Sequence, residues 1–240
     1  MSQLILIRHG ESEWNRDHRF TGWADVDLTE LGRTQMHDAG VLLRREGLAV
    51  DQAFTSVLSR CIRSQWALLE GMGTVWVPVA LDWRLNERHY GALTGLSKAA
   101  AVDAHGAEQV QRWRRSFATP PPHGLGDGDG HPIVDERYAQ LPPGSIPQGE
   151  SLAQVVERVR SVWLQSIVAA LRAGQRVVVT AHGNSLRALI KLIEGIADDD
   201  ISSLEVPNAV PIVYEMDAQL RLVRKATLAT GAATAPSEIL

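Results

Sequence analysis

Two histidines, each followed by glycine, come directly after short apolar runs. His9 follows the run in "LILIRHG", and His182 follows the run in "VVVTAHG". Continuous apolar runs of this length are typical of buried strands. Open parallel sheets bind ligands beyond the carboxyl ends of their strands. If the two strands are neighbours in one sheet, we expect both imidazoles to meet in one crevice.

A histidine at a strand end can be a hydrogen-bonded structural residue, a metal ligand or a nucleophile. The sequence contains no HxH, HExxH or Cys/His cluster of the kind that binds metals. Its acidic stretch "DGDG", residues 127–130, lacks the remaining acidic ligands and closing glutamate of a calcium loop. We therefore expect no metal.

Phosphate chemistry accounts for the residues around His9. A neutral imidazole is abundant at neutral pH and can attack phosphorus. Arg8 suits phosphate oxygens, which a guanidinium binds bidentately, and Gly10 lets a tetrahedral anion approach the backbone. Gly183 and Asn184 begin a helix whose free N–H groups attract anions. The sequence therefore favours His9 as a nucleophile toward a phosphate group.

Strands alternate with helices along the chain, which predicts a single α/β domain of three layers, α/β/α, around a mainly parallel sheet. The domain is expected to span 1–225, with a loop and helix insertion at about 95–150 over the site and a flexible tail at 226–240. The expected strands are 3–8, 52–56, 74–79, 175–181, 211–216 and 220–224, with Pro78 placing 74–79 near an edge. The expected helices are 28–47 (capped by Thr29), 57–71, 96–104, 107–117, 150–174 and 183–195.

The overall composition is ordinary for a globular protein. The chain has 240 residues, 45% of them hydrophobic, and a net charge of −4, which argues against nucleic acid or an acidic membrane as the main partner. Cys61 is the only cysteine, so an internal disulfide is excluded and a reducing compartment is expected. No apolar run reaches the roughly 18 residues of a membrane span. The expected location is the cytoplasm.

Six stretches carry a family resemblance. They are "RHGESEWN", "RFTGWADVDLTELG", "TSVLSR", "LNERHYGALTGLSK", "WRRSF" and "AHGNSLRALIK". The chain resembles the histidine phosphatase superfamily. Within it, the chain looks most like the 2,3-bisphosphoglycerate-dependent phosphoglycerate mutases, in order over about residues 3–216.

The resemblance implies a role for each matching residue. His9 resembles the phosphorylated nucleophile, Glu87 the general acid and base, and His182 the second histidine that steadies the transferring group. Arg8 and Arg60 would hold that group. The substrate-binding residues implied are Ser12, Asn15, Thr21, Gly22, Tyr90, Lys98, Arg114, Arg115, Gly183 and Asn184. Without the family context, Arg60, Lys98 and the arginine pair would be interpreted as solvated helix charges, and Glu87 as a cap or an ion-pair partner.

The activity implied is the interconversion of 3- and 2-phosphoglycerate in glycolysis and gluconeogenesis. It would be primed by 2,3-bisphosphoglycerate and carried out by a homodimer or homotetramer, with Trp76–Leu81 as a candidate contact edge. One alternative is a phosphatase of small phosphomonoesters that uses the same residues. Another is a non-catalytic phospho-ligand-binding module. The sequence departs from the family pattern at Asn208-Ala209, where Thr-Gly is expected, and in its shorter C-terminal tail, which has no lysine after Lys225.

Overall fold

A six-stranded mixed sheet forms the centre of the molecule, in the order β3-β2-β4-β1-β5-β6. The structure is a computed structural model that describes residues 1–124, 135–142 and 144–229. The first four strands in this order pair in parallel, whereas β5 is antiparallel to both of its neighbours. The strands are β1 Ser2–Arg8, β2 Gln52–Thr55, β3 Val79–Leu81, β4 Val177–Ala181, β5 Ile212–Met216 and β6 Leu222–Thr227. The predicted α/β fold with a mostly parallel sheet is confirmed.

β1 and β4 lie side by side, so the strand order that the two histidines require is present. Arg8 is in register with Ala181, and the His9 N–H donates to the Ala181 carbonyl at 3.0 Å. His9 and His182 therefore leave the sheet at the same height. Two distant parts of the sequence meet because parallel strands share one carboxyl edge.

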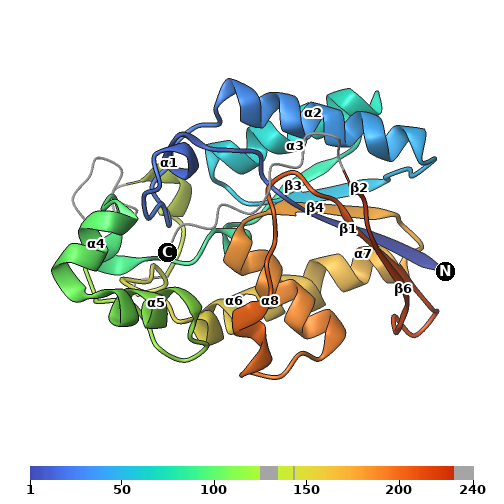
Figure 1. The fold of residues 1–240 in the computed structure, drawn as a ribbon. Helices are drawn as coiled ribbons and strands as arrows, with labels where there is room; N and C mark the ends of the chain where they lie inside the picture. The colour runs from blue at the N-terminus through green and yellow to red at the C-terminus, as the bar shows by residue number, and fades with distance from the viewer. Residues whose placement is uncertain (125–134, 143, 230–240) are drawn as a thin grey trace.

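Helices cover both faces of the sheet (Figure 1). On one face lie α2 Glu30–Arg45 and α3 Ser59–Met72, and on the other lie α6 Leu152–Val162, α7 Val168–Arg172 and α8 Gly183–Glu194. Residues of β1 alternate between the two cores: Leu4 and Leu6 belong to one, Ile5 and Ile7 to the other. Burial on both faces explains why this strand is apolar throughout.

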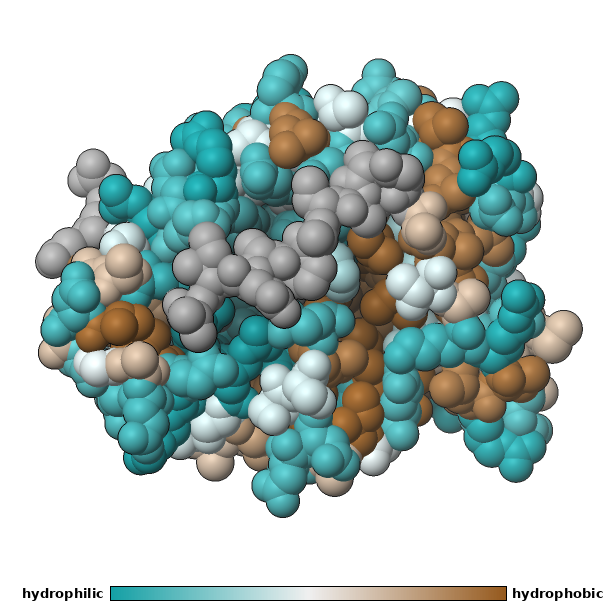
Figure 2. All heavy atoms as spheres, in the orientation of Figure 1, coloured by the Kyte–Doolittle hydropathy of each residue, from teal (hydrophilic) through white to brown (hydrophobic). Residues whose placement is uncertain are grey.

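Shorter elements gather beyond the carboxyl end of the parallel strands, on the side opposite the N-terminus (Figure 1). They are α1 Glu13–Arg16, α4 Lys98–His105, α5 Ala107–Arg115 and the 3₁₀ turns at Trp83–Leu85, Gly91–Leu93, Glu136–Tyr138 and Asp200–Ser203. A small separate core containing Phe20, Leu93, Ala101 and Val110 holds part of this group together. Mainly hydrophilic side chains cover this end of the molecule (Figure 2).

The structure differs from the predicted elements in four places. The strand expected at 74–79 lies at Val79–Leu81, after Pro78, although its edge position is as predicted. α3 ends at Met72, where Gly73 caps it in the left-handed conformation, and not at Gly71. The helix predicted over 150–174 contains a π-helical turn, Trp163–Ile167. β6 reaches Thr227, so the first residues of the predicted tail belong to the sheet.

Other sequence-based predictions cannot be compared with the structure. Residues 127–130 and the rest of the predicted tail from 230 onward lie outside the described residues. Within the described part of the chain, no helix combines the length and the apolar character that a membrane span requires.

Candidate active site

His9 is held so that one ring nitrogen is committed and the other is available. Its Nδ1 lies 2.7 Å from the Gly10 carbonyl oxygen. Because a carbonyl only accepts, Nδ1 carries the proton and Nε2 keeps its lone pair. The residue is almost fully buried. This is the protonation state that a nucleophilic imidazole needs.

His182 lies against His9, with ring centroids 5.1 Å apart and planes at 64°. Its Nε2 is 2.8 Å from Ser56 Oγ and 3.3 Å from Cys61 Sγ, and all three side chains are buried. His182 also caps α8, since its backbone N–H donates to Ser185 Oγ at 3.0 Å. The two predicted histidines therefore meet in one site.

Burial and nearby guanidinium groups keep both imidazoles neutral. Burial lowers the pKa of His9 well below its ordinary value of 6.5, and Arg60 and Arg8 lower it further. The pKa of His182 is lowered for the same reasons, with an added contribution from His9. Both rings thus remain neutral through the physiological pH range.

Arg60 is completely buried near the start of α3, contrary to the interpretation as a solvated helix charge. Its Nη1 and Nη2 donate to the carbonyls of Ala24 and Gly22, each at 2.8 Å. Burial lowers the pKa of this guanidinium. Gly22 has φ 55°, a backbone conformation that favours glycine. Arg60 thus fixes the loop of Thr21 and Gly22 while contributing positive charge next to His9.

Glu87 is anchored through one of its two oxygens. Oε1 accepts from the Arg88 N–H at 2.8 Å, the Asn184 N–H at 3.1 Å and Asn184 Nδ2 at 2.9 Å. The other oxygen, Oε2, faces Gly183 and Arg8: a Cβ added to Gly183 would lie 3.7 Å from both Oε2 and Arg8 Cζ. The start of α8, Glu87 and Arg8 therefore border one space.

A buried ion pair that the sequence analysis missed supports the loop that carries Glu87. Arg158 Nε donates to Glu150 Oε1 at 2.8 Å, and both side chains are nearly inaccessible. Arg158 also donates to the carbonyls of Arg84, Asn86 and Glu87, at 2.8, 3.1 and 3.3 Å. Trp23 Nε1 donates to the same Glu87 carbonyl at 2.6 Å. These contacts fix the backbone from Arg84 to Glu87, which carries the proposed acid and base.

A group of cations lies next to this space. Arg114 and Arg115 on α5 and Lys98 at the start of α4 were predicted, and the structure adds Arg88 and Arg187. Burial lowers the pKa of Lys98 to about 8, with further contributions from Arg114, Arg8 and Arg115. Burial and the charges of Arg115 and Arg88 lower the pKa of Arg187 to about 10. Burial is the larger cause of both shifts, and the neighbouring cations add to it, so several positive charges lie close together here.

Other contacts define where these cations point. Arg115 Nη2 pairs with Glu205 at 2.5 Å, and the Arg88 guanidinium lies 4.8 Å from the Tyr90 ring centroid. The Tyr90 hydroxyl accepts from Asn184 Nδ2 at 3.2 Å, which joins this group to Glu87. The sequence held a signal for Arg88 and Arg187, since each closely follows a predicted site residue, in "NERHYG" and "NSLRAL".

Several guanidinium nitrogens in this region have no partner. Arg8 Nε, Arg88 Nε and Nη1, and Arg187 Nε are buried without a hydrogen bond among the described residues. Buried donors are rarely left unsatisfied in folded proteins. An anionic ligand would satisfy them.

The two polar residues after the RHG motif have a local structural role. Ser12 and Asn15 form the capping box of α1: the Ser12 N–H donates to Asn15 Oδ1, and the Asn15 N–H donates to Ser12 Oγ, each at 3.2 Å. This pairing holds the turn after His9. Their contact with a ligand stays a prediction.

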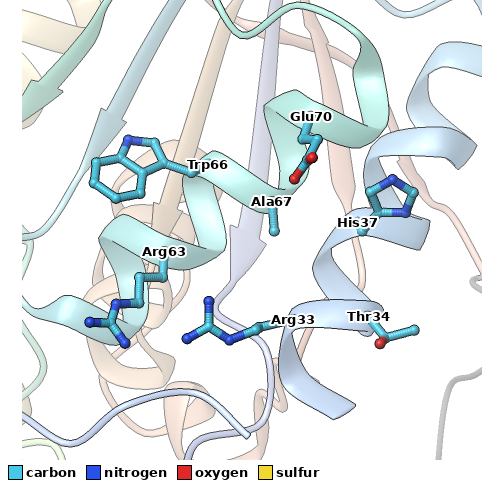
Figure 3. Close-up of a pocket in the computed structure, with 7 residues that line it drawn as sticks. All are labelled: Arg33, Thr34, His37, Arg63, Trp66, Ala67 and Glu70. Carbon is cyan, nitrogen blue, oxygen red and sulfur yellow. The ribbon is translucent and has the colours of Figure 1, made fainter. Parts of the chain in front are cut away.

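A separate hollow lies on the outer surface of α2 and α3 (Figure 3). It measures about 440 Å³ and contains none of the predicted site residues. Its walls are formed by Arg33, Thr34, His37, Arg63, Trp66, Ala67 and Glu70.

No three His, Cys, Asp or Glu side chains cluster as a metal site in residues 1–124, 135–142 and 144–229.

Comparison with known proteins identifies the family of this chain and solved structures with a similar fold. The model of the histidine phosphatase superfamily, branch 1, matches residues 4–141 and 130–227. A solved structure described as mycobacterial hydrolase 1 is 24% identical with a TM-score of 0.72, and the match covers 98% of this chain and 100% of that one. A mycobacterial glucosyl-3-phosphoglycerate phosphatase in complex with VO3 is 25% identical, with coverage of 95% and 97% and a TM-score of 0.70. A putative alpha-ribazole-5'-P phosphatase from Escherichia coli shares the fold at 20% identity, with coverage of 93% and 94% and a TM-score of 0.69.

The two neutral histidines make folding stability depend on pH. Each imidazole takes up a proton near pH 6.5 in the unfolded chain but not in the folded one, so stability falls as the pH drops below about 6.5. We expect a loss of up to about 1.4 kcal/mol per pH unit for each histidine. Urea unfolding between about pH 7.5 and 5.5 measures this, and His182→Gln should remove one histidine's share of the slope. An unchanged slope in that variant would contradict the assignment.

The Glu150–Arg158 pair should be essential for stability. Arg158→Met removes the charge partner of the buried Glu150 carboxylate and the Arg158 donor to the Arg84 and Asn86 carbonyls, and we expect unfolding to become easier by about 3–5 kcal/mol. Arg160→Met on the same helix is the matched control, because Arg160 forms an exposed pair with Glu157. It should change stability by less than about 1 kcal/mol. Similar denaturation midpoints for the two variants would show that the pair has no special role.

Proposed function

Because this chain belongs to branch 1 of the histidine phosphatase superfamily, we propose that it transfers phosphoryl groups through a phosphohistidine at His9. The proposed substrate is a small phosphorylated acid of the phosphoglycerate class. The observation that carries the substrate proposal is the set of buried guanidinium nitrogens without partners, on Arg8, Arg88 and Arg187. Arg8 lies beside His9, whereas the other two belong to the cationic group beyond Glu87. One anionic group of the substrate would bind beside His9, and the other would bind in the cationic group beyond Glu87.

The first step forms the bond between His9 Nε2 and phosphorus. As the ester P–O bond breaks, the leaving oxygen takes a proton from the Glu87 carboxyl group. His182, Arg8 and Arg60 surround the transferring group with hydrogen-bond donors and positive charge. Loose phosphoryl-transfer transition states need mainly such positioning and charge. In the second step, the Glu87 carboxylate removes a proton from the acceptor hydroxyl, which attacks phosphorus and releases His9.

The acceptor distinguishes two activities. If it is the free hydroxyl of a bound phosphoglycerate, the enzyme interconverts 3- and 2-phosphoglycerate and needs 2,3-bisphosphoglycerate as primer. The second cationic place supports this activity, since it could hold a carboxylate or a second phosphate while the substrate turns over. The motif set from "RHGESEWN" to "AHGNSLRALIK" supports it as well.

The second candidate is a phosphatase, in which water is the acceptor. The solved relatives favour this activity over the mutase activity, because those with named substrates are phosphatases. One of them acts on a glucosylated 3-phosphoglycerate, which also carries two anionic groups. The same group of cations would then determine substrate specificity.

Trp76 and Leu81, on and beside the edge strand β3, are 76% and 51% exposed. This exposure supports the proposal of a homodimer that pairs along that edge, and it leaves the chemistry above unchanged.

Product analysis separates the two acceptors. With 3-phosphoglycerate and a trace of 2,3-bisphosphoglycerate, we expect ³¹P NMR to show 2-phosphoglycerate forming faster than inorganic phosphate. His9→Asn is the control and should show neither product. Phosphate without isomer would establish the phosphatase. If neither product forms, the proposed substrate class is wrong. If no acid-labile phosphate is detected on the wild-type protein, the proposed phosphohistidine is wrong.

Removing one cation should weaken binding of the second anionic group alone. We expect Arg114→Gln to lower kcat/KM for 3-phosphoglycerate by about 10- to 100-fold, the usual effect of a lost charge-assisted hydrogen bond. Turnover of p-nitrophenyl phosphate, which has no carboxylate, should change less than about 3-fold. Arg112→Gln on the same helix is the control, because Arg112 pairs with Glu108 on the exposed surface. Equal losses on both substrates would place Arg114 outside the second anion site.

A further inference from the structure

Asn208, in the segment before β5, holds the backbone of the RHG motif. Its Nδ2 donates to the His9 carbonyl at 2.6 Å and lies 3.3 Å from the Gly10 carbonyl. Its own backbone forms a bridge with Arg8, and the Ala209 N–H donates to the Arg8 carbonyl at 2.9 Å. One side chain therefore contacts two successive carbonyls of the motif that carries the nucleophile.

The Gly10 carbonyl is the group that selects the state of the His9 ring. The same oxygen that Asn208 contacts accepts from His9 Nδ1 at 2.7 Å. The other end of this residue is also held, because the Gly10 N–H donates to Ser64 Oγ at 3.1 Å. The orientation of this carbonyl decides whether Nδ1 or Nε2 carries the proton.

The segment around Asn208 is held tightly. Ala209 has φ 56° and is almost fully buried, a left-handed conformation that residues with a Cβ seldom adopt. Such strain persists only where surrounding contacts determine the backbone. Gly10 has no room to move either, since a Cβ on it would lie 2.1 Å from the Gly32 carbonyl oxygen.

We propose that Asn208 is a positioning residue for the nucleophile: its amide orients the Gly10 carbonyl, which keeps the proton on Nδ1 and leaves Nε2 free to attack. The inference rests on the proposed role of His9. In the attack, the Nε2 lone pair forms the N–P bond, the ester P–O bond breaks and Glu87 supplies the proton to the leaving oxygen. The Nδ1 proton stays in place throughout. The opposite tautomer has its proton on Nε2 and cannot attack.

Substitution at 208 tests this through the rate of phosphorylation. We expect Asn208→Ala to slow phosphorylation of His9 by about 10- to 100-fold, the usual loss when a supporting partner of a reactive group is removed. Affinity for inorganic phosphate, which binds without a bond to Nε2, should change less than about 3-fold, because Arg8 and Arg60 are untouched. Asn208→Thr restores a single donor and should give an intermediate rate. Ala209→Gly, which keeps the Asn208 side chain, is the matched control and should phosphorylate at the wild-type rate.

A second measurement reports the ring itself. Long-range ¹H–¹⁵N correlation spectra of ¹⁵N-histidine-labelled protein should show His9 protonated at Nδ1 in the wild type, and a mixture of tautomers in Asn208→Ala. A wild-type tautomer together with a wild-type phosphorylation rate in Asn208→Ala would overturn the inference. An equal fall in rate for Ala209→Gly would also overturn it, since the effect would then belong to the backbone. If the wild-type protein never forms phosphohistidine, the proposed function fails, whereas the spectra still test whether Asn208 sets the tautomer.

Discussion

The structure depends on one constraint: positive charge is collected where water hardly reaches. Arg60, His9 and His182 are buried, and the charges of Arg60 and Arg8 act on both imidazoles. Arg88 and Arg187 belong to the neighbouring group of cations. Charges of one sign in a medium of low dielectric repel each other strongly. The site meets this constraint in two ways. The imidazoles stay neutral, and some of the N–H groups of Arg60 and Arg88 donate to backbone carbonyls. In the proposed function, the remaining donors bind an anion, and relief of the repulsion between the cations favours binding of a phosphorylated ligand.

The supports of the site follow from the same constraint, because a reactive group surrounded by cations must be held in one orientation. The parallel register of β1 and β4 places the two imidazoles together. The buried ion pair Glu150–Arg158 supports the loop that carries the proposed acid and base, Glu87. There it neutralises its own charge while binding three carbonyls, which is the arrangement in which a buried pair is tolerated. Reactive residues thus come from strand ends and loops, whereas their rigidity comes from helices packed beneath them.

The sequence predicted the sheet and both helical layers, and it named most of the residues that the structure brings together in the candidate site, because these features rest on local pattern. β1 and β4 are continuous apolar runs, and Thr29 caps α2 as expected. What it missed depends on contacts between distant residues. Arg158 appears as one more charge on an amphipathic helix until the fold brings Glu150 and three carbonyls around it. Asn208 appears only as a departure from Thr-Gly, since nothing in its neighbourhood reveals the carbonyls of residues far earlier in the chain. The predicted strand 74–79 differs from the observed β3, Val79–Leu81, because an apolar run at a sheet edge does not show where strand pairing begins.

The difference between the two candidate activities reduces to what competes for phosphorus. Water is small and abundant, whereas a hydroxyl on a bound acid acts at an effective concentration that can reach about 10⁵–10⁸ M when its geometry is right. Both candidate activities use the same nucleophile, the same acid and base, and the same cations around the transferring group. They differ in how firmly the second anionic end is held after the first transfer. In the proposed function, Lys98, Arg114 and Arg187 carry that difference, because their charges would act on the part of the substrate that does not react. A site that grips this end long enough for the molecule to turn over returns the phosphoryl group to the substrate, and one that releases it leaves the phosphohistidine to water.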